Sequence, residues 1–219
     1  KQATATRTDV LKGDVAGSAL HYAARAGDLH VLAYLLDLRA NPLSAANVES
    51  DFEGLSPMGI AARHGHREVL EALFKISGLG EKQMQFRSHK GLQPVHQAAR
   101  RGHAACVEFF LDHGAPAYDD VVKAPLAGFA CVAGSTKILE SLASRRVDLS
   151  MRGGDGVGPV HMAAWAGHLS VATKLLALGV SPEDEDLNGE KPADVAAREG
   201  HHDVAALLIS QQRQKQEEL

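Results

Sequence analysis

An all-α solenoid of stacked helix pairs is the fold class that this sequence predicts, and three observations predict it. A helical segment rich in alanine recurs along the chain, each copy ends at a glycine, and each glycine is followed by a second helical segment with an apolar face. The clearest copy runs from Gly91 to His103 (GLQPVHQAARRGH) and continues through Cys106 to Ala115. Because neither helix of such a pair can bury its apolar face alone, stacked neighbours must supply the core.

The glycine that ends the first helix of each copy is called the turn glycine below. The distance in sequence between successive turn glycines gives the length of each repeat. The six are Gly27, Gly65, Gly102, Gly134, Gly167 and Gly200, spaced 38, 37, 32, 33 and 33 residues apart. Glycine supplies the left-handed conformation that a helix C-terminus favours. The second helix carries apolar residues four, five, eight and nine places past the glycine, which form one helical face. We expect the residues eight places on to be buried between repeats: Leu35, Leu73, Phe110, Leu142, Leu175 and Leu208.

The first helix of each copy also has a recognisable start. In the segment SPMGIAARHG, Ser56 can cap the free N–H groups of the helix and Pro57 suits its first position. Related segments read ALHYAARAG, QPVHQAARRG, GPVHMAAWAG and KPADVAAREG. This pattern resembles the ankyrin repeat, whose period is 33 residues and whose core signature is T-P-L-H-x-A. The resemblance implies a non-catalytic module that binds a peptide or protein through a concave groove and the tips of β-hairpin fingers.

The repeats divide the chain into three parts. Residues 1–16 form a polar lead-in, residues 17–210 the repeat domain and residues 211–219 a polar tail. The six repeats occupy about 17–53, 54–90, 91–122, 123–155, 156–188 and 189–210. Two junctions, Asn41 to Leu55 and Ile76 to Leu92, are longer than the others, and the resemblance implies that they form projecting β-hairpin fingers. Such insertions are tolerated because the cost of closing a loop grows slowly with its length.

Repeat four departs from the pattern. Eight steps separate Leu126 from Gly134, whereas seven separate Val95 from Gly102. Ala127 would then stand at the histidine position of T-P-L-H, with Gly128 in the middle of the helix. The interval indicates drift in a middle repeat or one extra residue absorbed as a π-bulge, a feature often found at functional sites. We expect this repeat to be the least stable of the array.

Composition excludes several classes of protein. Of the 219 residues, 45% are hydrophobic and 5% aromatic, which suits a core of small and aliphatic side chains. No window approaches the roughly 20 apolar residues that span a bilayer, so we expect no membrane insertion. The net charge of −4 gives no general argument for nucleic acid. Two cysteines are too few for a disulfide framework, which favours an intracellular protein of the cytoplasm or nucleus.

The sequence offers little that could carry catalysis or hold a metal. Most of the twelve histidines fall on repeat positions, and none forms a cluster with zinc-site spacing. The segment Gly153 to Gly158 superficially resembles a phosphate loop but lacks the following Lys-Ser/Thr, so we assign it to a finger. The acidic run Glu183 to Asp186 is interpreted as solvated loop. We therefore expect no enzyme activity, cofactor or metal.

The two residues after the paired alanines face the groove in the ankyrin family. At these positions, the residues that we expect to contact a partner are Arg25, Arg63, His64, Arg100, Arg101 and Trp165. Arginine and tryptophan are enriched among binding hot spots, and three successive repeats with arginine predict a protein or peptide partner with negative charge. Phe52, in the first long finger, is a further anchor candidate.

Other functions remain open from the sequence alone. The chain could be the cytosolic ankyrin domain of a larger channel or regulatory enzyme, or it could bind a small ligand at the irregular fourth repeat. Nucleic-acid binding through the arginines is disfavoured by the acidic balance and by the lack of interleaved aromatic residues. Neither the partner's identity nor the oligomeric state follows from the sequence.

Overall fold

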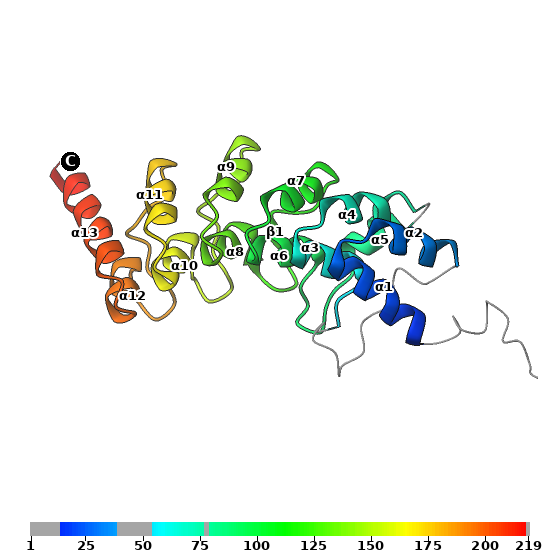
Figure 1. Ribbon diagram of the computed structural model, residues 1–219. Coiled ribbons are helices and arrows are strands. Elements are labelled where there is room, and N and C mark those ends of the chain that lie inside the picture. The colour runs from blue at the N-terminus through cyan, green and yellow to red at the C-terminus, as the bar shows by residue number, and fades with distance from the viewer. Residues whose placement is uncertain (1–13, 39–53, 77–78, 218–219) are drawn as a thin grey trace, which may run out of the picture. The chain divides into compact units, whose positions relative to one another are not determined.

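The protein consists of helix pairs that stack in two compact units (Figure 1). The structure, a computed structural model, describes residues 14–38, 54–76 and 79–217. Residues Lys1–Ala115 belong to the first unit and residues Pro116–Leu219 to the second. Among the described residues, every helix is too short or too polar to cross a lipid bilayer. Helices dominate both units, as predicted.

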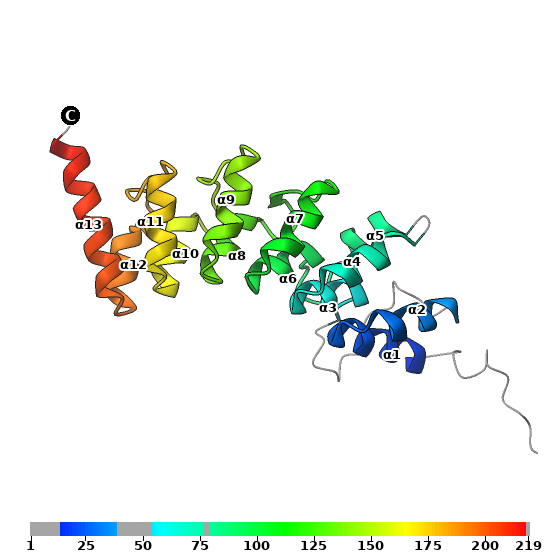
Figure 2. The same cartoon turned by 45° about the horizontal axis from the view of Figure 1, so that its top comes forward.

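The described part of the first unit contains three helix pairs and one additional helix. The pairs are α1 (Asp14–Ala26) with α2 (Leu29–Asp37), α3 (Pro57–His64) with α4 (Arg67–Phe74), and α6 (Pro94–Arg100) with α7 (Ala104–Asp112). The additional helix, α5 (Gly80–Gln85), lies between the second and third pairs in the chain. The inner helices α1, α3 and α6 lie side by side, and the outer helices α2, α4 and α7 form a second row (Figures 1 and 2).

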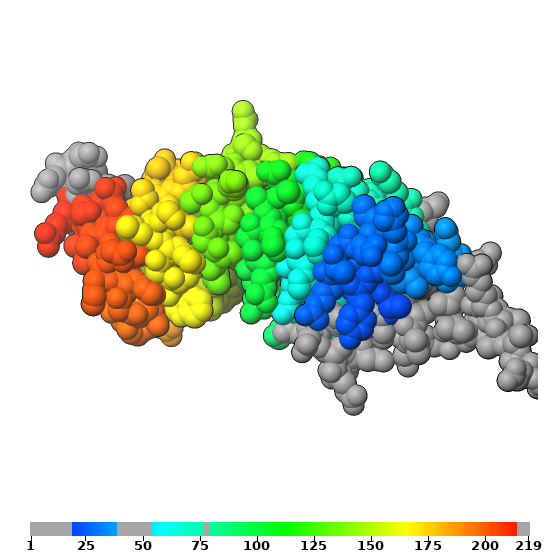
Figure 3. Space-filling model, viewed as in Figure 1, coloured from blue at the N-terminus to red at the C-terminus, as the bar shows by residue number. Residues whose placement is uncertain are grey.

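The second unit repeats this arrangement. Its pairs are α8 (Leu126–Val132) with α9 (Thr136–Ser144), α10 (Pro159–Ala166) with α11 (Leu169–Ala177), and α12 (Pro192–Arg198) with α13 (His202–Glu217). Two short antiparallel strands, β1 (Tyr118–Asp119) and β2 (Ala124–Pro125), form a finger before α8, with Tyr118 opposite Pro125. Within each unit the pairs follow one another in chain order as adjacent bands (Figure 3). Helix α13 continues well into residues 211–219, the segment expected to be a polar tail.

The core lies between neighbouring pairs, at the positions that the glycine spacing predicted. Of the six residues eight places past a turn glycine, Leu35 is 8% exposed and the other five are 0% exposed. The start of α3 is also as expected, because the N–H of Gly59 donates to the Ser56 hydroxyl at 3.2 Å and Pro57 takes the first helical position. The predicted register is therefore confirmed.

The second long junction differs from the expectation of a simple finger. Its extra residues form helix α5, which packs against α4 and α6. The side-chain amide of the buried Gln83 donates to the Leu73 carbonyl at 2.8 Å and so caps the end of α4. A β-carbon at Gly80 would lie 2.5 Å from the carbonyl oxygen of Phe74, so the close approach of α5 to α4 requires glycine. A turn between Ser88 and Leu92 then forms the finger itself.

The first helix of repeat four contains no extra residue, so that interpretation of the sequence was wrong. Helix α8 begins at Leu126, eight residues before its turn glycine, and α6 likewise begins at Pro94, eight residues before Gly102. Pro125 is therefore the cap of the helix, and Leu126 stands where other repeats have proline. Pro125-Leu126 also matches the Pro-Leu of the family signature T-P-L-H. For that reason the sequence pattern placed the start of this helix one residue too early. Gly128, not Ala127, occupies the histidine position, and α8 is an ordinary α-helix without a bulge.

Repeat four nevertheless carries local weaknesses in its finger and first helix. Lys123 has a φ of +48°, in the left-handed region, two residues before the helix cap. The same place is taken by glycine in the other fingers that the structure describes, namely Gly54, Gly91, Gly156 and Gly189. A residue with a β-carbon pays roughly 1–2 kcal/mol for this conformation. The buried Asp119 offsets part of this cost, since its carboxylate accepts N–H bonds from Val121 and Val122.

We expect amide hydrogen exchange to be faster across Ala124 to Leu142 than across Pro94 to Leu111. Repeat four combines the strained Lys123 with Gly128 in mid-helix, and Ser135 follows its turn glycine where repeats two, three, five and six have histidine. A solenoid repeat contacts only its neighbours, so a weak repeat opens locally. Exchange followed by mass spectrometry would measure the difference, and equal protection of the two segments would contradict it.

Substitution of Gly128 by alanine should stabilise the protein by about 0.5–1 kcal/mol, because alanine is the better helix former. A β-carbon there would meet its nearest neighbours, Met162 Cγ and Pro125 Cγ, at 3.7 Å, an ordinary contact distance. Chemical denaturation would measure the gain. The matched control, Gly80→Ala, should destabilise the protein because of the clash with the Phe74 carbonyl. A loss of stability in Gly128→Ala would disprove this account of the helix.

Candidate protein-interaction surface

Arginine side chains gather at the ends of the inner helices in the first unit. Arg25 lies in the last turn of α1, Arg63 near the end of α3 and Arg100 at the end of α6. Together with the neighbouring His64 and Arg101 these residues are called the arginine strip below. All are exposed except Arg63, which is half-buried. These five residues are among those that the sequence predicted to contact a partner.

The backbone beneath the strip is fixed by a histidine that follows the turn glycine of the next repeat. His66 Nε2–H donates to the Arg25 carbonyl at 2.9 Å, and His103 Nε2–H donates to the Arg63 carbonyl at 3.0 Å. Each imidazole lies over the preceding turn glycine, so that a β-carbon at Gly65 would approach His103 Nδ1 to 2.7 Å. The main chain at two arginines is thus held by the next repeat.

The same contact recurs in the second unit. His168 donates to the Val132 carbonyl at 3.1 Å, and His201 donates to the Trp165 carbonyl at 3.2 Å. The sequence placed these four histidines on repeat positions but did not predict this contact. Their regular place after the turn glycine, in four of the six repeats, was the signal that could have identified them.

Three of the four arginines in the strip act electrostatically on His64. The pKa of His64 lies below its ordinary value of 6.5, first because of partial burial and then because of the charges of Arg25, Arg63, His66 and Arg101. Arginines from different repeats therefore contribute to one positive field around α3. The unfolded chain binds this proton more readily than the folded one, so the contribution of His64 to stability, present above pH 6.5, is lost as the pH falls.

Replacing both Arg25 and Arg101 by glutamine should raise the pKa of His64 toward 6.5. Each substitution removes a positive charge that disfavours the protonated ring, while the effect of burial remains. NMR titration of the imidazole protons would measure the shift. Lys137→Gln removes an exposed charge from α9 in the second unit and serves as the control. An unchanged His64 titration in the double variant would mean that the strip does not share one field.

In the second unit the equivalent positions have a different character. Trp165, at the end of α10, is 51% exposed, and Val132 is half-buried at the end of α8. Arg198, at the end of α12, pairs with Glu190 and with Glu199, and these carboxylates raise its pKa. The second unit therefore offers an aromatic side chain and an ion-paired arginine where the first unit offers the strip.

The acidic run after α11 also takes part in ion pairs. Asp184 lies 2.8 Å from Arg152 Nη2, and Glu183 lies 3.0 Å from Lys191 Nζ. Arg152 donates a further hydrogen bond to the Glu185 carbonyl at 2.9 Å. The contacts of Arg152 join neighbouring fingers of the second unit, whereas the Glu183–Lys191 pair lies within one finger. The carboxylates thus have structural partners.

Histidines at the T-P-L-H position have structural roles. His161 Nδ1 accepts the Gly158 N–H at 3.2 Å while its Nε2–H donates to the Glu190 carbonyl of the next repeat at 3.1 Å. His21 Nε2 bonds the Leu55 carbonyl in the same way at 3.0 Å. Within the described segments no three His, Cys, Asp or Glu side chains are placed to share a metal ion.

The cysteines are buried thiols. Burial raises the pKa of Cys106 to about 11 and raises that of Cys131 further still. Because the thiolate is the reactive form, neither is a nucleophile near neutral pH. Among the predicted contact residues, the structure brings Arg25, Arg63, His64 and Arg101 into one field and places Arg100 beside them on α6. Trp165 belongs to the second unit, and Phe52 lies outside the described residues.

Comparisons with known proteins agree with this architecture. A family model described as "Ankyrin repeats (3 copies)" matches residues 6–85 and 128–218, and one described as "Ankyrin repeat" matches residues 90–121. The chain is 27% identical over 187 residues to the ankyrin repeat and KH domain-containing protein mask-1 of Caenorhabditis elegans, covering 85% of this chain and 7% of that protein. It is 28% identical over 174 residues to the E3 ubiquitin-protein ligase KEG of Arabidopsis thaliana, covering 77% of this chain and 10% of that protein.

A solved structure is also similar. The human ASB11 ankyrin repeat domain matches with a TM-score of 0.75 and 26% identity, over 87% of this chain and 82% of that one. The chain therefore spans a small part of the two curated relatives named above but most of a solved repeat domain. The family models, the stacked pairs and the turn histidines together establish that the chain belongs to the ankyrin-repeat family.

Proposed function

We propose that this chain is a non-catalytic protein-interaction module whose arginine strip binds an acidic segment of a protein partner. Ankyrin repeats are generally protein-interaction modules, and the observation that supports the finer proposal is the shared positive field at His64. The buried free thiols Cys106 and Cys131 suit a reducing compartment, so we place this activity inside the cell.

The chemistry of the strip favours carboxylates. The guanidinium group is planar and presents a fixed fork of N–H donors, so it can bind a carboxylate through two parallel hydrogen bonds. Hydrogen bonds to charged groups contribute roughly 1.5–3 kcal/mol each. Because the main chain beneath Arg25 and Arg63 is already held by His66 and His103, little backbone entropy is lost when a ligand binds.

Labelled peptides of equal length, strongly acidic, neutral and strongly basic, would test the proposal by fluorescence anisotropy. We expect the acidic peptide to bind most tightly and its affinity to fall as salt is raised, since exposed charges are screened within about 10 Å at 0.1 M ionic strength. Equal binding of the three peptides, or an acidic-peptide affinity that does not depend on salt, would overturn the assignment of the strip.

A further inference from the structure

One side chain of the arginine strip can change its charge near neutral pH. His64 is the last residue of α3 and is exposed. It holds the repeat position that Ala26 holds in repeat one and Arg101 in repeat three. The arginines of the strip stay protonated in proteins, so His64 is the one member of the strip that titrates between about pH 5 and pH 8.

A second imidazole lies beside His64 but is committed to the backbone. The rings of His64 and His66 are nearly parallel, with 13° between their planes and 6.4 Å between their centroids. His66 Nε2–H donates to the Arg25 carbonyl at 2.9 Å, and a β-carbon at Gly27 would approach its Nδ1 to 2.7 Å. His66 is half-buried. Of the two rings, His64 is therefore the one that a ligand on the strip can reach.

Positive charge reaches His64 from every helix that packs against α3, namely α1, α4 and α6. Partial burial lowers the pKa of His64 first, and charges from these helices and from α3 itself lower it further: Arg25 of α1, Arg63 of α3, His66 at the start of α4 and Arg101 at the end of α6. Other titratable groups on the packed helices bond elsewhere: His21 to the Leu55 carbonyl, His96 to the Gln93 N–H, and Arg67 to Glu71.

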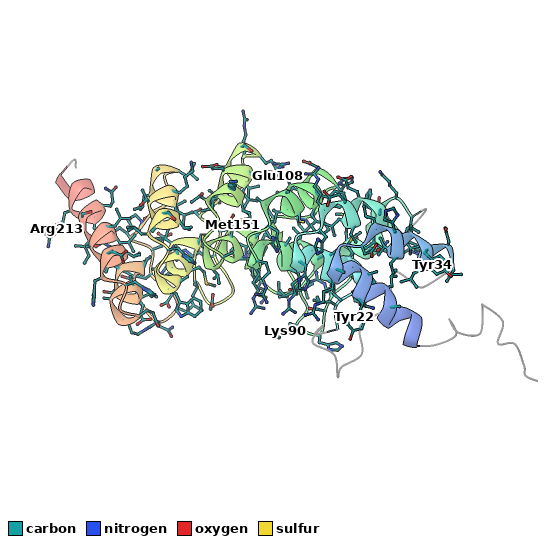
Figure 4. All side chains as sticks on the ribbon, viewed as in Figure 1. Tyr22, Tyr34, Lys90, Glu108, Met151 and Arg213 are labelled. Atoms are coloured by element: carbon teal, nitrogen blue, oxygen red, sulfur yellow. The ribbon has the colours of Figure 1, made fainter. Side chains whose placement is uncertain are left out.

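Carboxylates of the same unit occur on the outer helices α4 and α7, namely Glu68, Glu71, Glu108 and Asp112. Figure 4 shows Glu108, on α7, on the opposite side of the unit from Lys90, in the finger that leads into α6. The largest charge effects on His64 are all positive. Negative charge beside this ring is thus what a bound acidic segment would add.

We infer that an acidic segment binds the arginine strip together with a proton that His64 takes up, so that the strip binds it more tightly at mildly acidic pH than at pH 8. The inference rests on the proposed function and concerns the regulation of the same site. A carboxylate close to an imidazole favours the protonated ring. The complex therefore keeps the proton to a higher pH than the unliganded chain does, and by linkage the affinity rises as the pH falls through that interval.

Isothermal titration calorimetry of the native chain with an aspartate-rich peptide tests the inference. Aspartate has an ordinary pKa of about 3.9, so the peptide stays ionised from about pH 5.5 to pH 8. We expect Kd to be about tenfold lower at pH 5.5 than at pH 8, as for a tenfold gain in proton affinity on binding. Near pH 6.5 the heat should also depend on the ionisation enthalpy of the buffer, because a proton is taken up.

The outcomes separate this inference from the proposed function. If the peptide binds with a Kd that does not change with pH, or binds without proton uptake, the inference is overturned and the proposed function stands. If the peptide binds at neither pH, both are overturned. Tighter binding at pH 5.5 with proton uptake supports both.

Substitutions then assign the proton to one ring. His64→Gln should remove most of the pH dependence of Kd, whereas His30→Gln, at an exposed histidine of the outer helix α2, should retain it. His64→Lys keeps a positive charge throughout this range and should bind with a Kd that varies little with pH. NMR titration of the native chain should show a higher pKa of His64 with the peptide than without it. An equal pKa in the two states, or a pH dependence that persists in both His64 variants, would overturn the inference because another group would carry the proton.

Discussion

Truncation of Leu73 to alanine should lower the free energy of unfolding by about 2–5 kcal/mol, the range measured for buried leucines. Leu73 is 0% exposed and lies in α4, which packs against α2, α3, α5 and α7. The cost exceeds the lost burial of the side chain alone, since the surrounding helices leave a cavity that they fill only in part. Urea denaturation followed by circular dichroism would measure it.

The matched control lies two residues further on. Lys75 is exposed at the end of the same helix, and Lys75→Ala should change stability by no more than about 0.5 kcal/mol, as surface substitutions usually do. If Leu73→Ala cost no more than this control, the burial register shared by the six repeats would be wrong. Because repeats contact only their neighbours, the loss should be largest in the first unit and measurable there by hydrogen exchange.

The repeat architecture was predictable because its signals are local and recur. Glycine at a helix end, apolar residues at fixed offsets and Ser56-Pro57 at a helix start each act within one or two turns. Six copies allow each signal to be checked against the others. The positions of the arginines followed from the same offsets.

What the sequence did not predict depends on contacts between distant residues. Helix α5 is held by Gln83 on the Leu73 carbonyl and by the close approach of Gly80 to Phe74, neither of which has a sequence pattern. The start of the first helix in repeat four was predicted one residue too early. Pro125-Leu126 matches the Pro-Leu of the family signature, but the helix begins at Leu126 and Pro125 is its cap. Arg198 occupies the same repeat position as Arg25, Arg63 and Arg100, and its ion pairs with Glu190 and Glu199 had no sequence signal.

Charge reversal of Arg63 and Arg100 together should weaken binding of an acidic peptide by about 10²–10⁴-fold. Loss of two charge-assisted hydrogen bonds, at roughly 1.5–3 kcal/mol each, corresponds to that change in Kd. The introduced carboxylates also repel the ligand, so the lower value is a minimum. Anisotropy titration of the Arg63→Glu, Arg100→Glu variant would measure the loss, and both sites are on the surface or half-buried, so helical circular dichroism and melting should be unchanged.

Two comparisons separate the strip from a general effect of net charge. The variant Lys75→Glu, Lys137→Glu makes the same change in net charge at exposed outer-helix positions and should bind the acidic peptide as the native chain does. A lysine-substituted peptide should recover affinity for the Arg63→Glu, Arg100→Glu variant, because the signs of both partners are then exchanged. If the reversed variant is folded and still binds the acidic peptide as tightly as the native chain, the strip is not the site. Trp165, the exposed aromatic residue of the second unit, is then the next position to substitute.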